Sequence, residues 1–250
     1  TRRKIRELTA TKCRDNMISL EVREDDTTGI AGEGTIMDAT VLSAFAFCPQ
    51  ARSAAWTEGE SEYDRQKTVC FAKGYSENVT IEVTGPQNWR WRRIAVQFHN
   101  DDVRTAFGDV TGGTTTVGRL ARKTSGNGHV RTLYDFSANA PAYQELFRQI
   151  FQGTQGTDWS DIFNAKLNRR RCRVISDRIR NINGGNLGGY WSGARDYFPI
   201  NRTVMYNEKE IGNTKSDPTN NEFESNFTWF SAPHAGAGET FIIDLFACAS

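Results

Sequence analysis

The most chemically suggestive stretch of this chain is Trp89-Arg90-Trp91-Arg92-Arg93. Guanidinium groups pair well with phosphates, and indole faces stack on nucleic-acid bases or on the guanidinium groups themselves. This stretch could therefore contact a nucleic acid, with a tryptophan as the stacking platform. It could equally be an edge strand whose arginines are simply solvated, and the residues alone leave both interpretations open.

Two further basic clusters lie far from this stretch in the sequence. They are Arg2, Arg3, Lys4 and Arg6 near the beginning, and Arg169, Arg170, Arg171 and Arg173 in the second half. If the three clusters converged on one face, they would form an electrostatic track for a phosphate backbone. We favour this clustering because the acidic residues concentrate elsewhere, in 21–26, 58–64 and 208–224, although solvated scattering of the arginines would also fit the net charge of +1. The arginines of the third cluster could instead form salt bridges to acidic loops of a neighbouring subunit.

The sequence does not single out a catalytic centre. His99 lies close to Asp101 and Asp102, as in some nuclease sites, but Asn100-Asp101-Asp102 is ordinary turn composition. The other two histidines stand in glycine-flanked segments, and no serine-hydrolase or zinc-protease motif occurs. The thirty acidic residues allow many spatial pairings, a glycosidase pair among them, but the sequence singles none out. We therefore expect no enzymatic activity.

No cofactor or metal is expected either. The five cysteines are Cys13, Cys48, Cys70, Cys172 and Cys248, an odd number at wide spacings without a CxxC pair. Such spacing argues against a zinc site and against a disulfide framework. No stretch is as long as a membrane span, and no apolar leader precedes the first strand, so we expect no membrane association.

Strands must position these residues. Ile94, Val96 and Phe98 alternate with Ala95 and Gln97, which predicts a strand with one buried side. Similar patterns predict further strands at 18–22, 69–72, 79–83, 130–134, 174–182, 198–206, 223–230 and 240–248. The apolar segment 37–49 could be a short strand or a helix. This density of strands is typical of a single-domain sandwich or barrel.

One segment, 140–152, is predicted to be a helix. Asn139 or Ala140 can cap it, Pro141 suits its first turn, and Gly153 follows its end. Its apolar residues recur at the spacing of one helical face, which predicts packing against a sheet. They are Tyr143, Leu146, Phe147, Ile150 and Phe151.

An ordered set of motifs resembles the coat proteins of genomoviruses and of their geminivirus relatives. The motifs are Thr1-Arg2-Arg3-Lys4-Ile5, Thr11-Lys12-Cys13-Arg14-Asp15, Trp89-Arg90-Trp91-Arg92-Arg93, the helix 143–151 followed by Asp158-Trp159-Ser160-Asp161, Arg173-Val174-Ile175-Ser176-Asp177, the segment 203–212, and the strand 241–246. The resemblance spans nearly the whole chain.

The resemblance implies an all-β fold, a single eight-stranded jelly roll over residues 1–250 with one or two short helices and long loops. It implies self-assembly into a T=1 icosahedral shell, single or geminate, around circular single-stranded DNA. In that family a basic N-terminal arm binds the genome and carries nuclear import signals. Residues 1–14 would be the end of this arm, because the chain begins at Thr1 rather than Met. The expected partners are further copies of the chain, genomic DNA and host import factors, and the expected locations are the virion and the host nucleus.

Two other functions are compatible with the residues. A β-sandwich carbohydrate-binding module or hydrolase would use Trp159, Trp191 or Trp229 as a platform for a sugar ring. A cellular single-strand nucleic-acid-binding protein would use the same arginines but would remain a small oligomer.

Overall fold

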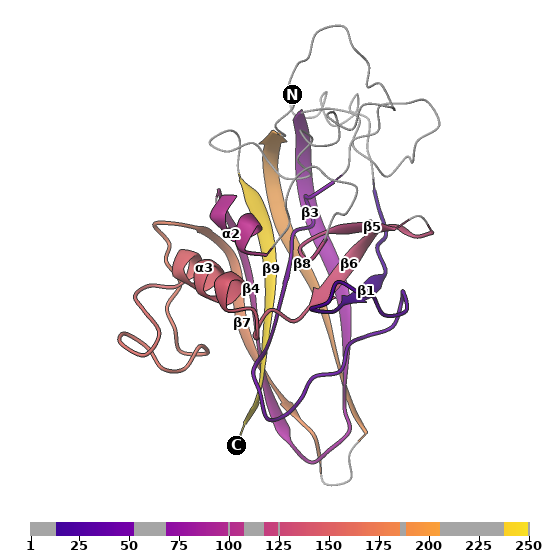
Figure 1. The fold of residues 1–250 in the computed structure, drawn as a ribbon, viewed down its shortest axis with the longest axis vertical. Helices are drawn as coiled ribbons and strands as arrows, with labels where there is room; N and C mark the ends of the chain where they lie inside the picture. Colours follow the sequence, from indigo (N-terminus) through magenta and orange to yellow (C-terminus); the bar gives the residue numbers. More distant parts are fainter. Residues whose placement is uncertain are drawn as a thin grey trace, which may run out of the picture.

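The computed structural model describes residues 14–52, 69–99, 101–107, 118–124, 126–185, 189–205 and 238–249. Most of these residues are in strands, as expected for an all-β protein (Figure 1). The elements in chain order are β1 (Ser19–Val22), β2 (Ser43–Phe47), β3 (Val69–Val83), β4 (Asn88–Phe98), α2 (Asp101–Ala106), β5 (Arg122–Thr124), β6 (Gly128–Tyr134), α3 (Ala140–Ile150), β7 (Arg173–Asn183), β8 (Tyr190–Met205) and β9 (Glu239–Ala249).

The strands form three sheets. The largest is antiparallel and has the order β2-β9-β4-β7. Strands β3 and β8 form a long antiparallel ribbon, and β1, β6 and β5 form the third sheet. The strand expected at 223–230 lies outside the described residues.

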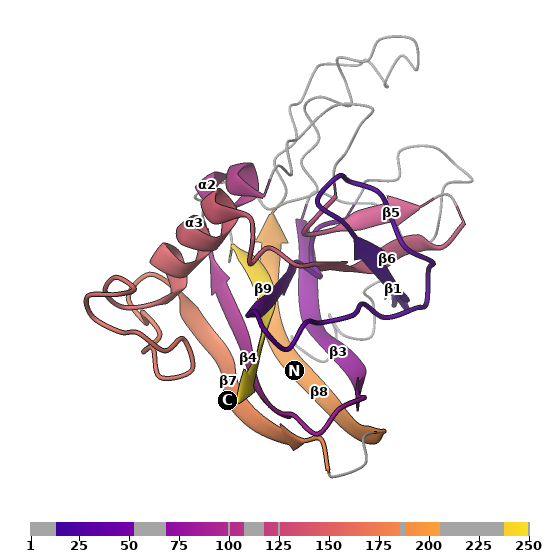
Figure 2. The ribbon, with the colours of Figure 1, turned by 60° about the horizontal axis from the view of Figure 1, so that its bottom comes forward.

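Both faces of the largest sheet are covered, which corrects the expectation that β4 has one buried side. Every residue of β4 from Trp91 to Phe98 is buried. One face, including Ile94 and Val96, packs against α3 in the main apolar core. The opposite face, including Trp91 and Ala95, packs against β3 and β8 (Figure 2). The observed arrangement is therefore two sheets packed face to face, with helices on the outside of one.

Several predicted elements have different bounds in the structure. The two strand segments expected at 69–72 and 79–83 are one fifteen-residue strand, β3, whose register shifts between Ala72 and Gly74. The undecided segment 37–49 contains a strand, β2. Asp101 and Asp102, expected in a turn, begin the short helix α2.

The predicted helix α3 is confirmed. The Asn139 side-chain oxygen accepts a hydrogen bond from the Ala142 N–H at 3.2 Å, and Pro141 lies in the first turn. Leu146 and Ile150 are buried against the sheet. After the helix, the chain folds back so that Phe151 pairs with Leu167. Helix α3 and the segment that follows it thus cover one end of the largest sheet.

We expect Leu146→Ala to lower the free energy of unfolding by about 2–5 kcal/mol, because it leaves a cavity in the main core. Gln144→Ala, a substitution at an exposed position of the same helix, is the matched control and should change that free energy by less than about 0.5 kcal/mol. Urea unfolding measures both. Equal effects of the two variants would contradict the packing of α3 described above.

Candidate functional site

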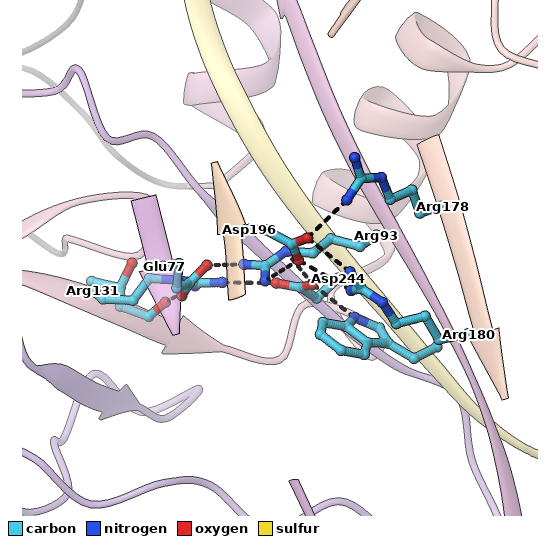
Figure 3. Close-up of polar contacts among 9 residues, drawn as sticks. Glu77, Arg93, Arg131, Arg178, Arg180, Asp196 and Asp244 are labelled. Carbon is cyan, nitrogen blue, oxygen red and sulfur yellow. Dashed lines mark hydrogen bonds and ion pairs between the residues drawn. The ribbon is translucent and has the colours of Figure 1, made fainter. Parts of the chain in front are cut away.

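Two of the three arginines of β4, Arg92 and Arg93, lie inside the molecule, and Arg90 is partly exposed. The Arg93 side chain is only 1% exposed and forms ion pairs with Asp196 at 3.1 Å, with Asp244 at 3.2 Å and with Glu77. These three carboxylates come from β8, β9 and β3 (Figure 3). The alternation of β4 explains the position of Arg93, because it shares the face of Trp91, which packs toward β3 and β8.

Three more arginines share these carboxylates. From β6, Arg131 contacts Glu77 at 3.0 Å and Asp244 at 2.9 Å. From β7, Arg178 and Arg180 contact Asp196 at 3.1 Å and 2.7 Å (Figure 3). We call these seven residues the arginine–carboxylate network. It joins six strands of all three sheets, and it runs from the buried Arg93 to Arg178, whose side chain is 60% exposed.

The charges in this network explain the ionisation of its central carboxylate. Burial acts to raise the pKa of Asp196, but hydrogen bonds and charge from Arg180, together with the charge of Arg93, outweigh it. The pKa of Asp196 is therefore held below its ordinary value of 3.8. Four guanidinium groups face three carboxylates, so the network keeps one excess positive charge.

The tryptophans of β4 are also buried. Trp91 is 1% exposed, donates a hydrogen bond from its indole Nε1 to Asp244 at 2.8 Å, and stacks on Phe246 at a centroid distance of 5.5 Å. The Arg180 guanidinium lies 4.8 Å from the centre of its ring. Trp89 is buried in the same apolar cluster. Neither indole face is available for a nucleic-acid base, so we do not retain Trp89 and Trp91 as stacking platforms.

The remaining arginines of β4 are engaged within the chain as well. Arg92 is buried and binds both carboxylate oxygens of Asp177, at 2.9 and 2.8 Å. Arg90 pairs with Asp161 at 2.9 Å and lies over the Phe163 ring at 4.3 Å. Arg90, Arg92 and Arg93 thus hold the fold together, and we do not retain this cluster as a DNA-binding surface. Neither sequence-based interpretation, a phosphate-binding surface or a solvated edge strand, foresaw this role.

The cluster at 169–173 is exposed, unlike that of β4. Arg171 donates a hydrogen bond to the Arg148 carbonyl oxygen at 2.8 Å, and Arg173 donates one to the Gln97 side-chain oxygen at 3.1 Å. Arg169 and Arg170 form no ion pair with any residue that the structure describes. Arg2, Arg3, Lys4 and Arg6 lie outside the described residues, so their convergence with this cluster stays a prediction.

The other candidate residues are dispersed. Trp159 is partly buried, with its ring 5.2 Å from that of Phe151, whereas Trp191 on β8 is 62% exposed. Trp229 lies outside the described residues. Within the described part of the chain, no group of three or more metal-binding side chains gathers, and no helix is long and apolar enough to cross a membrane.

Because Arg93 is buried and Arg178 is mostly exposed, we expect these two arginines to contribute unequally to the stability of the fold. We expect Arg93→Met to lower the free energy of unfolding by about 3–5 kcal/mol, because it leaves buried carboxylates without their main partner. Arg178→Met, the matched control, removes a mostly exposed partner of Asp196 and should cost less than about 1 kcal/mol. Urea unfolding at neutral pH compares them. A loss for Arg93→Met no larger than that for Arg178→Met would refute the central position of Arg93.

Asp196 should also make stability depend on pH. Its pKa in the folded chain lies below its ordinary value of 3.8, so its contribution is present above that value and is lost as the pH falls through the folded pKa. We expect Asp196→Asn to be less stable at neutral pH and to lose less further stability than the wild type between about pH 5 and about pH 3. An unchanged acid dependence, measured by urea unfolding, would contradict this assignment.

Neither a known protein family nor a curated protein matches the chain.

Proposed function

We propose that this chain is a capsid subunit that folds as a jelly roll, assembles into a T=1 icosahedral shell, single or geminate, and packages circular single-stranded DNA. The coat-protein motifs in the sequence suggested this function. The observation that carries it here is the pairing of the strands.

A jelly roll can be derived by wrapping one long antiparallel ribbon of eight strands into two sheets. In that ribbon the first strand pairs with the eighth, the second with the seventh, the third with the sixth, and the fourth with the fifth. If β2 is taken as the first strand, these pairs are β2–β9, β3–β8, β4–β7 and β5–β6. All four pairs occur and all are antiparallel.

Wrapping adds one further requirement. It brings the eighth strand beside the third, which gives one sheet the order first, eighth, third, sixth. The largest sheet has the corresponding order β2-β9-β4-β7. The second sheet would place β8 beside β5, and the pairs β3–β8 and β5–β6 supply its two halves. This pattern supports the eight-stranded jelly roll, which is common among capsid proteins.

Binding of a genome without regard to sequence requires cations rather than a base-reading helix. Arg169 and Arg170 supply exposed cations on the described surface. The basic residues Arg2, Arg3, Lys4 and Arg6 would add to them as the end of an inward-pointing arm. Assembly in the host nucleus, with import factors bound to that arm, follows from the same proposal.

The direct test is to pass the purified protein over a sizing column, read absorbance at 260 and 280 nm, and image the excluded peak. Uniform spherical particles that protect DNA from nuclease are expected. A variant with Arg2, Arg3, Lys4 and Arg6 changed to Gln should form empty shells. Shells of that variant that still hold full-length DNA would exclude the arm as the packaging element.

Binding to single-stranded DNA gives a test for the exposed cluster. Each phosphate contact contributes about 0.7 to the slope of log affinity against log salt, so Arg169→Gln with Arg170→Gln should reduce this slope by about 1.4. The matched control, Arg195→Gln with Arg202→Gln, removes two exposed arginines from β8 and should leave the slope unchanged. Equal reductions in both variants would show that binding follows total charge.

One observation favours a second candidate, a carbohydrate-binding module. Phe71, Trp191 and Tyr197 are 65%, 62% and 55% exposed on the ribbon formed by β3 and β8. Such aromatic faces can stack on sugar rings. A monomer that binds glycans, ignores nucleic acid and forms no shell would favour this function. A cellular single-strand-binding protein would bind DNA but remain a small oligomer.

A further inference from the structure

A hollow of about 440 Å³ opens between the outer face of β4 and β7 and the segment that follows α3. The lining residues that concern its chemistry are Arg92, Asn164, Lys166, Arg169, Asp177 and Ile179. We call this hollow the loop pocket. Its volume lies within the range of small-ligand sites, about 300–1,000 Å³.

The charges of the loop pocket are unbalanced. Its one carboxylate, Asp177, accepts two hydrogen bonds from Arg92, at 2.9 and 2.8 Å, so this pair is electrically neutral as a unit. Lys166 and Arg169 are exposed and form no ion pair with the described residues. Within the described part of the chain, the positive charges of Lys166 and Arg169 are therefore left for a ligand to match.

The backbone that carries Lys166 and Arg169 is held in place by hydrogen bonds. The Lys166 carbonyl oxygen accepts a hydrogen bond from the Gln152 N–H at 2.9 Å, and the Asn168 N–H donates one to the Ile150 carbonyl oxygen at 2.7 Å. Arg169 begins a turn that closes with a hydrogen bond from the Cys172 N–H to the Asn168 carbonyl oxygen at 3.1 Å. Because this backbone is anchored to the end of α3, little ordering is needed when a ligand binds.

We propose that the loop pocket binds a phosphate monoester of nucleotide size. A monoester carries a charge of about −1.5 to −2 at neutral pH, which matches Lys166 and Arg169, whereas each phosphodiester carries only one negative charge. The phosphate lies between these two side chains. The organic group contacts the half-exposed Ile179 and the side-chain amide of Asn164.

This site does not depend on the proposed capsid function, because a free nucleotide can occupy it whether or not shells form. Calorimetric titration with deoxyadenosine monophosphate tests it, with deoxyadenosine as the uncharged probe. The wild type should bind the nucleotide and not the nucleoside. Lys166→Gln with Arg169→Gln should weaken binding by about tenfold or more, because it removes two charge-assisted contacts.

The matched control, Arg195→Gln with Arg202→Gln, makes the same change in net charge away from the loop pocket and should leave the affinity within about twofold. No binding by the wild type, or equal weakening in both variants, would overturn the proposal. A phosphate monoester can belong to a free nucleotide or to the 5′ end of a strand. Competition with oligothymidylate, with and without a 5′-phosphate, tests the second source. Because Arg169 can also contact phosphodiesters, both strands should compete, but the phosphorylated strand should displace the nucleotide at a concentration about tenfold lower. Equal displacement by both strands would overturn the proposal in favour of a phosphodiester track.

Discussion

The Arg93 guanidinium is buried, and its positive charge must be balanced by carboxylates. The rest of the structure depends on this constraint. A charge in a protein interior is very costly unless opposite charges and hydrogen bonds surround it. No single neighbouring strand supplies them here. Glu77, Asp196 and Asp244 come from three strands, and they meet at Arg93 only when both sheets are formed and stacked.

The strand registers make this dependence stricter. Glu77 lies directly opposite Asp196 in the β3–β8 ribbon, and Arg93 lies directly opposite Arg178 in the β4–β7 pair. Like charges in these positions destabilise an isolated strand pair. The β3–β8 ribbon therefore carries a repulsion that the facing sheet relieves. In the largest sheet, Asp244 lies directly opposite Arg93 on β9 and offsets part of the repulsion between Arg93 and Arg178. A slip by one residue would turn these side chains to the wrong face, so the network selects one register and one stacking of the sheets. Its contribution to specificity should exceed its contribution to stability.

Local patterns predicted much of the fold. The alternation around Ile94 and the apolar stripe of α3 identified two main elements. The stripe of α3 reflects burial against one surface, whereas β4 is buried on both faces, so its alternation predicted the strand but not its surroundings. The burial of Trp91 and Arg93 was missed because their chemistry resembles that of a nucleic-acid-binding surface, and burial depends on partners more than 100 residues away. A signal was nevertheless present. Asp196 stands in phase with the apolar Phe198, and Asp244 with Phe246. An acidic residue on the inward face of a strand requires a buried cation.

The pairing of arginines with carboxylates also determines which positive charges are accessible on the described surface. The arginines of β4 have carboxylate partners within the chain, so the sequence overstates the positive charge they present to solvent. The basic segment after α3 differs, because Lys166, Arg169 and Arg170 project from a backbone pinned at its turns and keep their charge accessible. An anchored cluster whose cations form no ion pair with the described residues attracts phosphate more effectively than a larger set of neutralised arginines. On the described surface, the anionic ligands proposed above would therefore find accessible positive charge on this segment rather than on the Trp89–Arg93 stretch that is most conspicuous in the sequence.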